Sequence, residues 1–133
     1  MQLLEHIHLT VASISETEHF LQAVSPEFVR RGGGNSADYG PWAHIGNETS
    51  YIALTEDPES NSMPELRHIG LLVQSVDELM ERLALAGYQP ADDSSLDTHP
   101  HRRRVYYVDG NGVDWEFVEY LSEQSSLRND YSL

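Results

Sequence analysis

The sequence predicts an α+β fold of two tandem βαβββ modules, which form a curved mixed sheet with the helices outside. The hexad HIHLTV from residue 6 returns as HIGLLV from residue 68, and segments 6–21 and 68–83 agree at seven of sixteen positions. Each copy alternates like a strand and then reaches Ser-x-x-Glu, the capping box that opens a helix. Because about 60 residues bury a poor core alone, the two halves are expected to share one sheet surface.

The first module is expected over residues 1–56. Alternation in its first strand turns Leu9 and Val11 toward the helix that follows, and His6 and His8 to the opposite face. That helix is predicted over residues 14–24, because apolar residues recur there at helical spacing and a proline follows its end.

The rest of this module is predicted to be strands. A short strand at 27–31 meets three consecutive glycines, which we interpret as a flexible turn because no phosphate-loop motif or helix signal accompanies them. Strands at 42–45 and 50–54 complete the module. Residues 56–64 are polar and contain two prolines, so they are interpreted as a linker.

The second module, residues 65–121, repeats the plan with stronger signals. Its helix is predicted over 76–86, with Gly87 placed to stop it. A polar loop leads to a strand at 102–108, and DGNG is typical of a hairpin turn before the last strand. That strand sends Trp115 and Phe117 one way and Glu116 the other. The polar tail, residues 122–133, is expected to be loose or to lie on a partner subunit.

The amino-acid composition argues against several classes of function. The chain of 133 residues is expected to be one domain, and its 22 acidic against 8 basic residues give a net charge of −14, which disfavours a nucleic-acid partner. Every basic residue is arginine and cysteine is absent, which excludes lysine Schiff bases and thiolate chemistry. No apolar run is long enough to span a bilayer and no signal peptide is recognised, so we expect no membrane partner and a cytoplasmic location.

Strand alternation places four chemically active side chains on the face away from the helices: His6, His8, His68 and Glu116. Two imidazoles and one carboxylate are a facial ligand set for a divalent metal, with positions left open for substrate. Taken singly, each has a plainer explanation as a surface or internally satisfied residue. Because His6 and His68 occupy equivalent positions in a repeat, symmetry favours the metal site.

These residues resemble the vicinal oxygen chelate superfamily, which includes glyoxalase I, extradiol dioxygenases, fosfomycin-resistance proteins, methylmalonyl-CoA epimerases and bleomycin-binding proteins. The matching motifs are the two hexads and VDGNGVDWEFVEY, which is similar to the family's DPDG hairpin with Gly110 in place of proline. The resemblance covers residues 4–121 and implies the metal ligands His6, His68 and Glu116. Ala53 stands where some members have a fourth ligand, which argues against a four-ligand site of the glyoxalase I type.

The resemblance further implies a homodimeric enzyme whose divalent metal, Fe, Mn, Ni or Zn, acts as a Lewis acid on vicinal oxygens of a small-molecule substrate. Lyase, isomerase, addition and ring-cleavage (dioxygenase) chemistry all stay open. The alternatives are a bleomycin-resistance type of protein that binds an antibiotic without chemistry, and a metal-bound but catalytically silent relative. His6 of one chain can share the metal with His68 and Glu116 of the other chain.

Further candidates surround this set. His8 and Glu116 are the catalytic candidates, His8 as a base or hydrogen-bond donor. Arginines 102 to 104 lie on a strand that alternates, so at least one is expected to meet an anionic substrate, and Arg104 is our candidate. His99 and His101 belong to the rim of the pocket, with His101 as the substrate-binding candidate. Either Tyr106 or Tyr107 lines the pocket, and Tyr106 is the residue that we carry forward.

Overall fold

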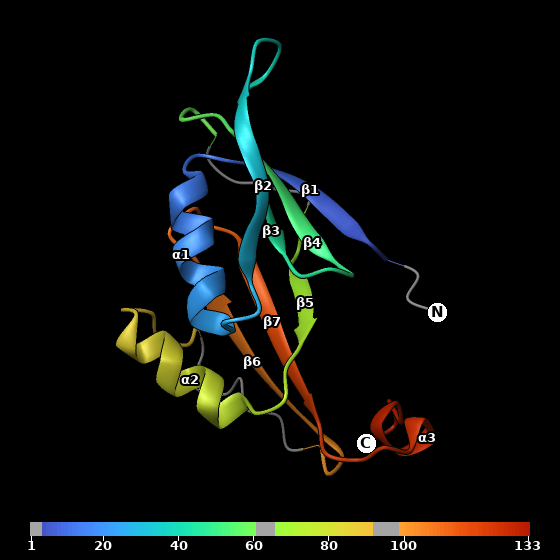
Figure 1. Ribbon diagram of the computed structural model, residues 1–133. Helices are drawn as coiled ribbons and strands as arrows, with labels where there is room; N and C mark the ends of the chain where they lie inside the picture. Colours follow the sequence, from blue (N-terminus) through green and yellow to red (C-terminus); the bar gives the residue numbers. More distant parts are fainter. Residues whose placement is uncertain (1–3, 61–65, 92–98) are drawn as a thin grey trace. The chain divides into compact units, whose positions relative to one another are not determined.

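The computed structural model describes residues 4–60, 66–91 and 99–133. The chain divides into two compact units, each with its own sheet (Figure 1). Unit 1 comprises Met1–Met63 together with Asp109–Gly112, and unit 2 comprises Pro64–Val108 and Val113–Leu133. The predicted α+β class is confirmed, and the strands of the two repeats fall in different units.

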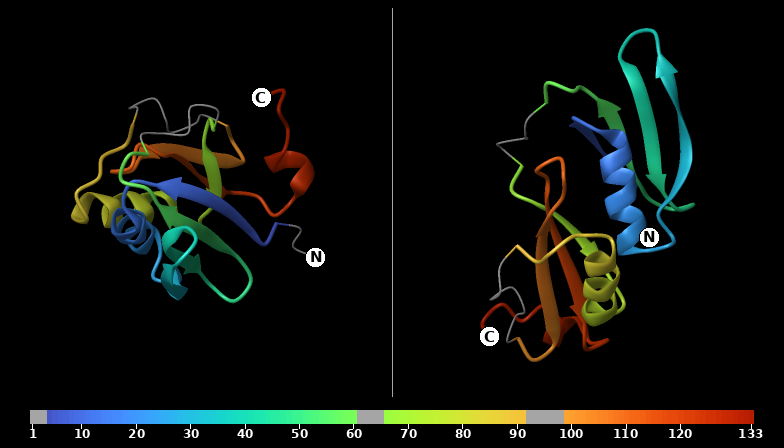
Figure 2. Two further views of the ribbon diagram at one scale, coloured as in Figure 1. Left: turned by 90° about the horizontal axis from the view of Figure 1, so that it is seen from above. Right: turned by 90° about the vertical axis from the view of Figure 1, so that its left-hand side faces the viewer.

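Unit 1 is a βαβββ unit. Its sheet has the order β1-β4-β3-β2, with β1 parallel to β4 and antiparallel pairing elsewhere. Helix α1 lies on one face of this sheet (Figure 2) and buries Phe20, Leu21 and Val24 against it. The elements are β1 (His6–Val11), α1 (Ile14–Val24), β2 (Val29–Ser36), β3 (Gly40–Gly46) and β4 (Tyr51–Glu56).

Unit 2 repeats the strand, helix, strands order of unit 1, with three strands among its described residues. Its sheet has the order β5-β7-β6, and α2 packs on β6 and β7. The fourth strand of the predicted βαβββ pattern is absent from the described part of unit 2, and much of the expected polar loop, residues 92–98, lies outside that part. The elements are β5 (Ile69–Leu72), α2 (Val76–Leu85), β6 (Arg102–Val108), β7 (Asp114–Tyr120) and α3 (Ser125–Arg128).

Both long helices begin in the same way. The hydroxyl of Ser13 accepts a hydrogen bond from the Glu16 amide at 3.2 Å, and Ser75 accepts one from Glu78 at 3.2 Å, as the capping motif predicts. A carboxylate at the end of the parallel strand adds a second cap in each unit. Glu56 accepts from the first helical amide of α1 at 2.9 Å, and its counterpart in unit 2 accepts from that of α2 at 2.8 Å. The repeat is therefore structural as well as sequential.

The glycine triplet is part of a strand, so its interpretation as a flexible turn is wrong. Gly32, Gly33 and Gly34 lie inside β2 and pair with β3. The indole of Trp42, on β3, lies over this strand, since a Cβ atom at Gly34 would be 3.3 Å from Trp42 Nε1 and one at Gly32 would be 3.7 Å from Cζ3. The missing side chains thus make room for a large ring from the neighbouring strand.

The predicted DGNG hairpin turn is confirmed, and it groups with unit 1. Gly112 adopts a φ of 82°, and its amide bonds to the Asp109 carbonyl at 3.1 Å. The amide group of Asn111 binds both backbone groups of Ser13, each at 2.9 Å. The amide of Gly110 donates to Glu16 at 3.0 Å, a bond that proline could not make.

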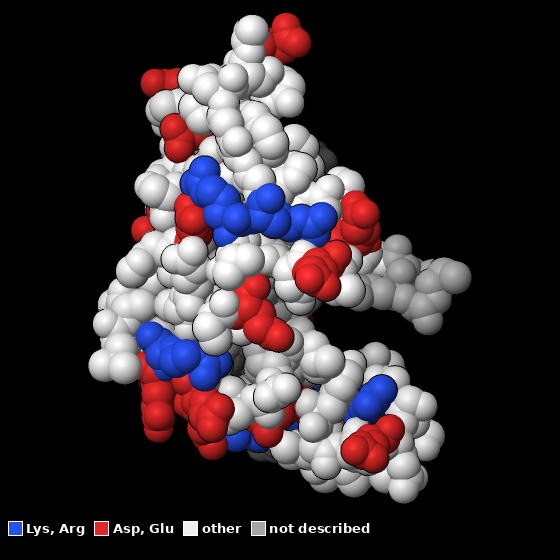
Figure 3. Space-filling model, viewed as in Figure 1, with Lys and Arg blue, Asp and Glu red and all other residues white. Residues whose placement is uncertain are grey.

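The C-terminal segment is tied to β6 and β7 by several contacts. The His99 ring donates to the Asp130 carbonyl at 2.8 Å, and the guanidinium of Arg102 lies 4.8 Å from the centre of the Tyr131 ring. Basic side chains lie against acidic ones on the face seen in Figure 3, and the measured ion pairs include Arg30 with Glu18 at 2.7 Å. Among the described helices, none is long and apolar enough to cross a membrane.

Candidate functional site

Four of the predicted site residues come together on the sheet of unit 2. His68 Nε2 lies 2.9 Å from Glu116 Oε2, and Arg104 Nη1 lies 3.7 Å from the other carboxylate oxygen. The Tyr106 ring stands edge-on to the His68 ring, with their centres 5.7 Å apart. An imidazole, a carboxylate, a guanidinium and a phenol therefore share one face of this sheet.

The core of unit 2 dictates this arrangement. Trp115 and Phe117 are fully buried beneath α2, so alternation turns Glu116 to the opposite face, as predicted. Gly70 pairs with Glu116 in the parallel ladder, and a Cβ atom there would lie 3.8 Å from the carboxylate. That distance is an ordinary van der Waals contact, so Gly70 is the residue of β5 beside the carboxylate. The Glu116 side chain is 13% exposed and that of His68 is 41% exposed.

His6 belongs to unit 1 and has a different setting. Its Nδ1 lies 2.7 Å from Glu5 Oε1, and its ring stacks on Tyr51 with a centre distance of 4.7 Å and an interplanar angle of 13°. The hydrogen bond to His6 holds the pKa of the Glu5 carboxyl below its usual value. With Nδ1 engaged by a carboxylate, Nε2 is the ring nitrogen left to act as a ligand, the arrangement common around metal-binding histidines.

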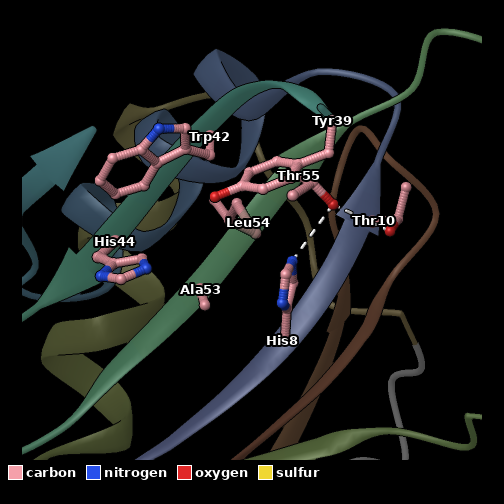
Figure 4. Close-up of a pocket in the computed structure, with 8 residues that line it drawn as sticks. All are labelled: His8, Thr10, Tyr39, Trp42, His44, Ala53, Leu54 and Thr55. Carbon is pink, nitrogen blue, oxygen red and sulfur yellow. Dashed lines mark hydrogen bonds between the residues drawn. The ribbon is translucent and has the colours of Figure 1, made fainter. Parts of the chain in front are cut away.

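A cavity of about 420 Å³ opens on the face of unit 1 away from α1 (Figure 4). His8, the predicted base, lies on its wall, and His8 Nε2 is 3.3 Å from the Thr55 hydroxyl. Thr55 is also 3.1 Å from the Thr10 hydroxyl, so a short polar chain runs along one side. The remaining lining residues are Tyr39, Trp42, His44, Ala53 and Leu54.

Ala53 explains why unit 1 has a cavity where unit 2 has a carboxylate. In unit 1 the residue paired with His8 across the parallel ladder is Ala53, whereas in unit 2 the residue paired with Gly70 is Glu116. His8 and Gly70 are equivalent in the sequence repeat, so Ala53 and Glu116 are equivalent too. The replacement of a carboxylate by a methyl group leaves space on this face of the sheet.

The lining of the cavity carries little charge. Burial, reinforced by the positive charge of Arg31, holds the pKa of the His44 imidazole below its ordinary value, so this ring is neutral at neutral pH. None of the residues that line the cavity in the described part of the chain is Asp, Glu or Arg. Such a site favours uncharged ligands.

Neighbouring residues of β6 point to opposite faces of the sheet and have different environments. Tyr107 is in the core, 1% exposed, where burial raises the pKa of its phenol, so Tyr106 is the tyrosine beside His68. Arg103 turns to the helix side and bonds Asp77 at 3.0 Å, opposite to Arg104, as alternation predicts. His101 lies beside His99, whose Nδ1 accepts its backbone amide at 3.1 Å, near the C-terminal segment.

The donor chemistry fits a divalent metal in part. His68 and Glu116 form an adjacent nitrogen and oxygen donor pair, and His6 presents a third donor on unit 1. Within the described residues, no group of three or more His, Asp or Glu side chains is placed so that it could hold a metal ion. The metal site shared by His6, His68 and Glu116 thus stays a prediction.

The aromatic side of the cavity was not predicted from the sequence. Trp42 and His44 lie two residues apart in the strand predicted at 42–45, so alternation alone places them on one face. The glycines of β2 are a second signal, because glycines on an exposed strand indicate a close approach by a neighbour. Tyr39 follows from neither signal, since it lies in the turn between β2 and β3.

Several solved structures match this chain over most of its length. A glyoxalase family protein from Enterococcus faecalis has a TM-score of 0.70 at 15% identity, with 89% of this chain and 98% of that chain covered. A variant of the fosfomycin resistance protein FosX from Listeria monocytogenes, complexed with Mn(II) and 1S,2S-dihydroxypropylphosphonic acid, has a TM-score of 0.71 at 21% identity and 98% coverage of both chains. A glyoxylase/bleomycin resistance protein/dioxygenase domain from Frankia sp. EAN1pec has a TM-score of 0.71 at 20% identity, with 90% of this chain and 98% of that chain covered.

Comparison at the level of sequence adds nothing further. No protein-family model matches the chain, and no curated protein matches it either. At identities of 15 to 21%, the structural likeness establishes the fold. The likeness expected from the two hexads is confirmed at the level of the fold: this chain has the α+β fold of the glyoxalase family and FosX proteins.

Proposed function

We propose that this protein is a divalent-metal-dependent enzyme that acts on a small molecule with vicinal oxygens. The proposed ligands are His6, His68 and Glu116. The observation that carries the proposal is the 2.9 Å approach of the partly exposed His68 Nε2 to Glu116 Oε2 on the face of unit 2 away from α2. A nitrogen and a carboxylate oxygen held this close would supply two of the three proposed ligands of a divalent-metal site.

The surroundings of these residues suit such a role. Glu5 holds Nδ1 of His6, so Nε2 points away from that hydrogen bond, and the stacked ring of Tyr51 limits rotation of the imidazole. Arg104 places a positive charge near Glu116 and can pair with an anionic group of a substrate. His8 can take up or release a proton at Nε2, where the hydroxyl of Thr55 fixes the ring. The metal would supply Lewis-acid stabilisation of developing negative charge.

Metal titration tests the proposal. Mn(II) is the probe, because the FosX neighbours were crystallised with it. We expect protein stripped with chelator to bind Mn(II) in calorimetry. His68→Ala and Glu116→Gln should each weaken binding at least about tenfold, since loss of one ligand from a three-ligand set removes a large share of the affinity.

The matched control is His19→Ala, which removes an exposed imidazole on α1. This variant should bind Mn(II) like the wild type. Equal binding by wild type, His68→Ala and Glu116→Gln would contradict the proposed ligand set. A turnover screen of the Mn(II)-loaded protein with the methylglyoxal–glutathione adduct, catechols and fosfomycin then separates an enzyme from a metal-bound but silent protein.

The aromatic cavity of unit 1 favours a second candidate function, which is ligand binding without chemistry. Its lining includes Trp42 and Tyr39 and none of the proposed metal ligands. Absence of Mn(II) binding together with tight binding of an organic ligand would support this candidate and overturn the first.

A further inference from the structure

The cavity of unit 1 has a flat aromatic wall, which depends on the packing of Trp42 against the glycines of β2. The indole of Trp42 lies over Gly32 and Gly34 of β2, with hypothetical Cβ atoms only 3.7 and 3.3 Å from its ring atoms. A Cβ atom at Gly34 would require the ring to shift slightly, and a larger side chain there would require more. One ring face therefore rests on the bare backbone of β2, and Trp42 also lines the cavity.

Other rings complete this wall. His44 meets Trp42 edge-on, with ring centres 5.0 Å apart. Tyr39 lines the cavity from the turn between β2 and β3, and Figure 4 shows its hydroxyl directed toward the other lining residues. Ala53 provides an apolar floor. Flat rings and small apolar groups provide a surface for stacking rather than for binding an extended chain.

The polar groups of the cavity are hydrogen-bonding side chains gathered along one side. Thr55 lies between Thr10 at 3.1 Å and His8 at 3.3 Å, so two hydroxyls and one imidazole form a short chain there. His44 is held neutral by burial, and none of the lining residues in the described part of the chain is Asp, Glu or Arg. A strongly anionic ligand would find no arginine to pair with in this cavity.

We infer that Trp42, seated on the glycines of β2, is a specificity-determining platform that selects a planar, uncharged ring bearing hydroxyl groups. The ring stacks on the indole, and its hydroxyls bond to the Thr10–Thr55–His8 side. The volume of about 420 Å³ accommodates such a molecule, since small-molecule sites typically measure about 300–1,000 Å³. The inference rests on the proposed function for the assignment of this ligand as the substrate.

Three probes separate the features of the ligand. Catechol has a flat ring and two vicinal hydroxyls, cyclohexane-1,2-diol has the hydroxyls without an aromatic face, and phenylphosphonate has the ring with negative charge. Binding is measured on the full chain in the presence of a chelator, by chemical-shift changes of backbone amides. We expect catechol to bind at least about tenfold more tightly than either of the other probes, with shifts in β3 and β4.

Substitutions test the platform itself. Trp42→Ala should weaken catechol binding about tenfold or more, whereas Trp42→Phe, which keeps an aromatic face, should weaken it about threefold. Gly34→Val retains the tryptophan but displaces its ring, so it should weaken binding as well. The control Tyr131→Ala removes an exposed ring from unit 2 and should leave binding unchanged. Circular dichroism confirms that each variant is folded.

The contrary results are equally clear. Equal binding of catechol and cyclohexane-1,2-diol, tighter binding of phenylphosphonate, or undiminished binding by folded Trp42→Ala would overturn the inference. Because this assay contains no metal, its result is independent of the Mn(II) titration. Ring binding without Mn(II) binding would leave Trp42 as the platform and remove the enzyme proposal, and Mn(II) binding without ring selectivity would do the reverse.

Discussion

Tyr106 and Tyr107 are adjacent in β6 and have opposite environments. Tyr107 is packed edge-on against Phe117 at 6.0 Å between ring centres, while Tyr106 stands beside His68. Tyrosine has an apolar ring and a polar tip, so the sequence alone is compatible with either residue in the core. Burial of Val105 on the same face as Tyr107 decides the phase of the strand.

Tyr107→Phe is expected to raise the free energy of unfolding by about 1 kcal/mol. The Tyr107 side chain is 1% exposed, and its hydroxyl has no hydrogen-bond partner among the described residues. Removal of that hydroxyl abolishes a desolvation cost while the ring packing is kept. Chemical denaturation of both proteins at neutral pH measures the difference. Loss of stability by more than about 1 kcal/mol would show that the hydroxyl is satisfied after all.

The same substitution should alter the alkaline limb of the stability curve. Burial raises the pKa of the Tyr107 phenol above its unfolded value of about 10. Below that pH both states carry the proton, and the stability is unaffected. Above it the unfolded state ionises first, so the wild type loses stability as the pH rises toward the folded pKa. Tyr107→Phe lacks this contribution and should lose less stability over the same range.

The metal candidates show what alternation along a strand can and cannot predict. It placed Glu116 opposite the buried Trp115 and Phe117, and it separated Arg104 from Arg103, but the pairing across the hairpin was needed to bring Arg104 to the face of Glu116. It could not supply the stacking of His6 on Tyr51, which depends on the register between β1 and β4. Alternation along a strand predicts which face of the sheet a side chain occupies. Which side chains it contacts depends on the pairing between strands that are distant in the sequence.

At the level of elements, the helices were more predictable than the glycine-rich strand. Helix α1 has the predicted bounds, and α2 ends one residue before the predicted end, with Gly87 at a φ of 98°. Caps and stop signals are local in the sequence, so they can be recognised there. Strand β2 was predicted only in part, as a short strand at 27–31, because its glycines are explained only by Trp42 on the next strand.

The turn between β6 and β7 is held to α1 by Asn111, which the sequence analysis did not single out. Its amide group binds the backbone of Ser13 at 2.9 Å and the hydroxyl of the buried Thr17 at 2.8 Å. Asn111→Ala is expected to lower the free energy of unfolding by about 1–3 kcal/mol, because buried polar groups lose their partners. Thermal or urea denaturation provides the measurement.

Asn35→Ala is the matched control, because Asn35 is an exposed asparagine of β2. It should change the stability by less than about 0.5 kcal/mol. Equal stability of the two variants would mean that the hydrogen bonds of Asn111 are replaced by water at no cost. In that case the turn would contribute little to the stability of unit 1.

At the scale of the whole molecule, the repeat predicts two similar units, and the structure shows how they have diverged. Glu56 and Glu119 cap their helices in the same way, whereas Ala53 and Glu116 occupy equivalent places with different chemistry. The carboxylate side of the proposed function therefore lies in unit 2, and the aromatic cavity lies in unit 1. The sequence repeat predicts the common fold of the two units. It does not predict the chemistry of the sheet face away from each helix, because equivalent positions there carry different residues.

We predict that the protein is a homodimer in which each metal site is shared between the two chains. We expect light scattering to show a dimer, with His6 of one chain and His68 and Glu116 of its partner as ligands of one ion. A heterodimer of His6→Ala and His68→Ala chains, isolated by two different affinity tags, then holds one site with all three ligands and one site with a single ligand. It should bind about one Mn(II) tightly, whereas each parent homodimer binds it weakly. If each site is built within one chain, both sites of the heterodimer lack a histidine, and its Mn(II) binding will match that of the parents. A monomer in solution would exclude sharing altogether.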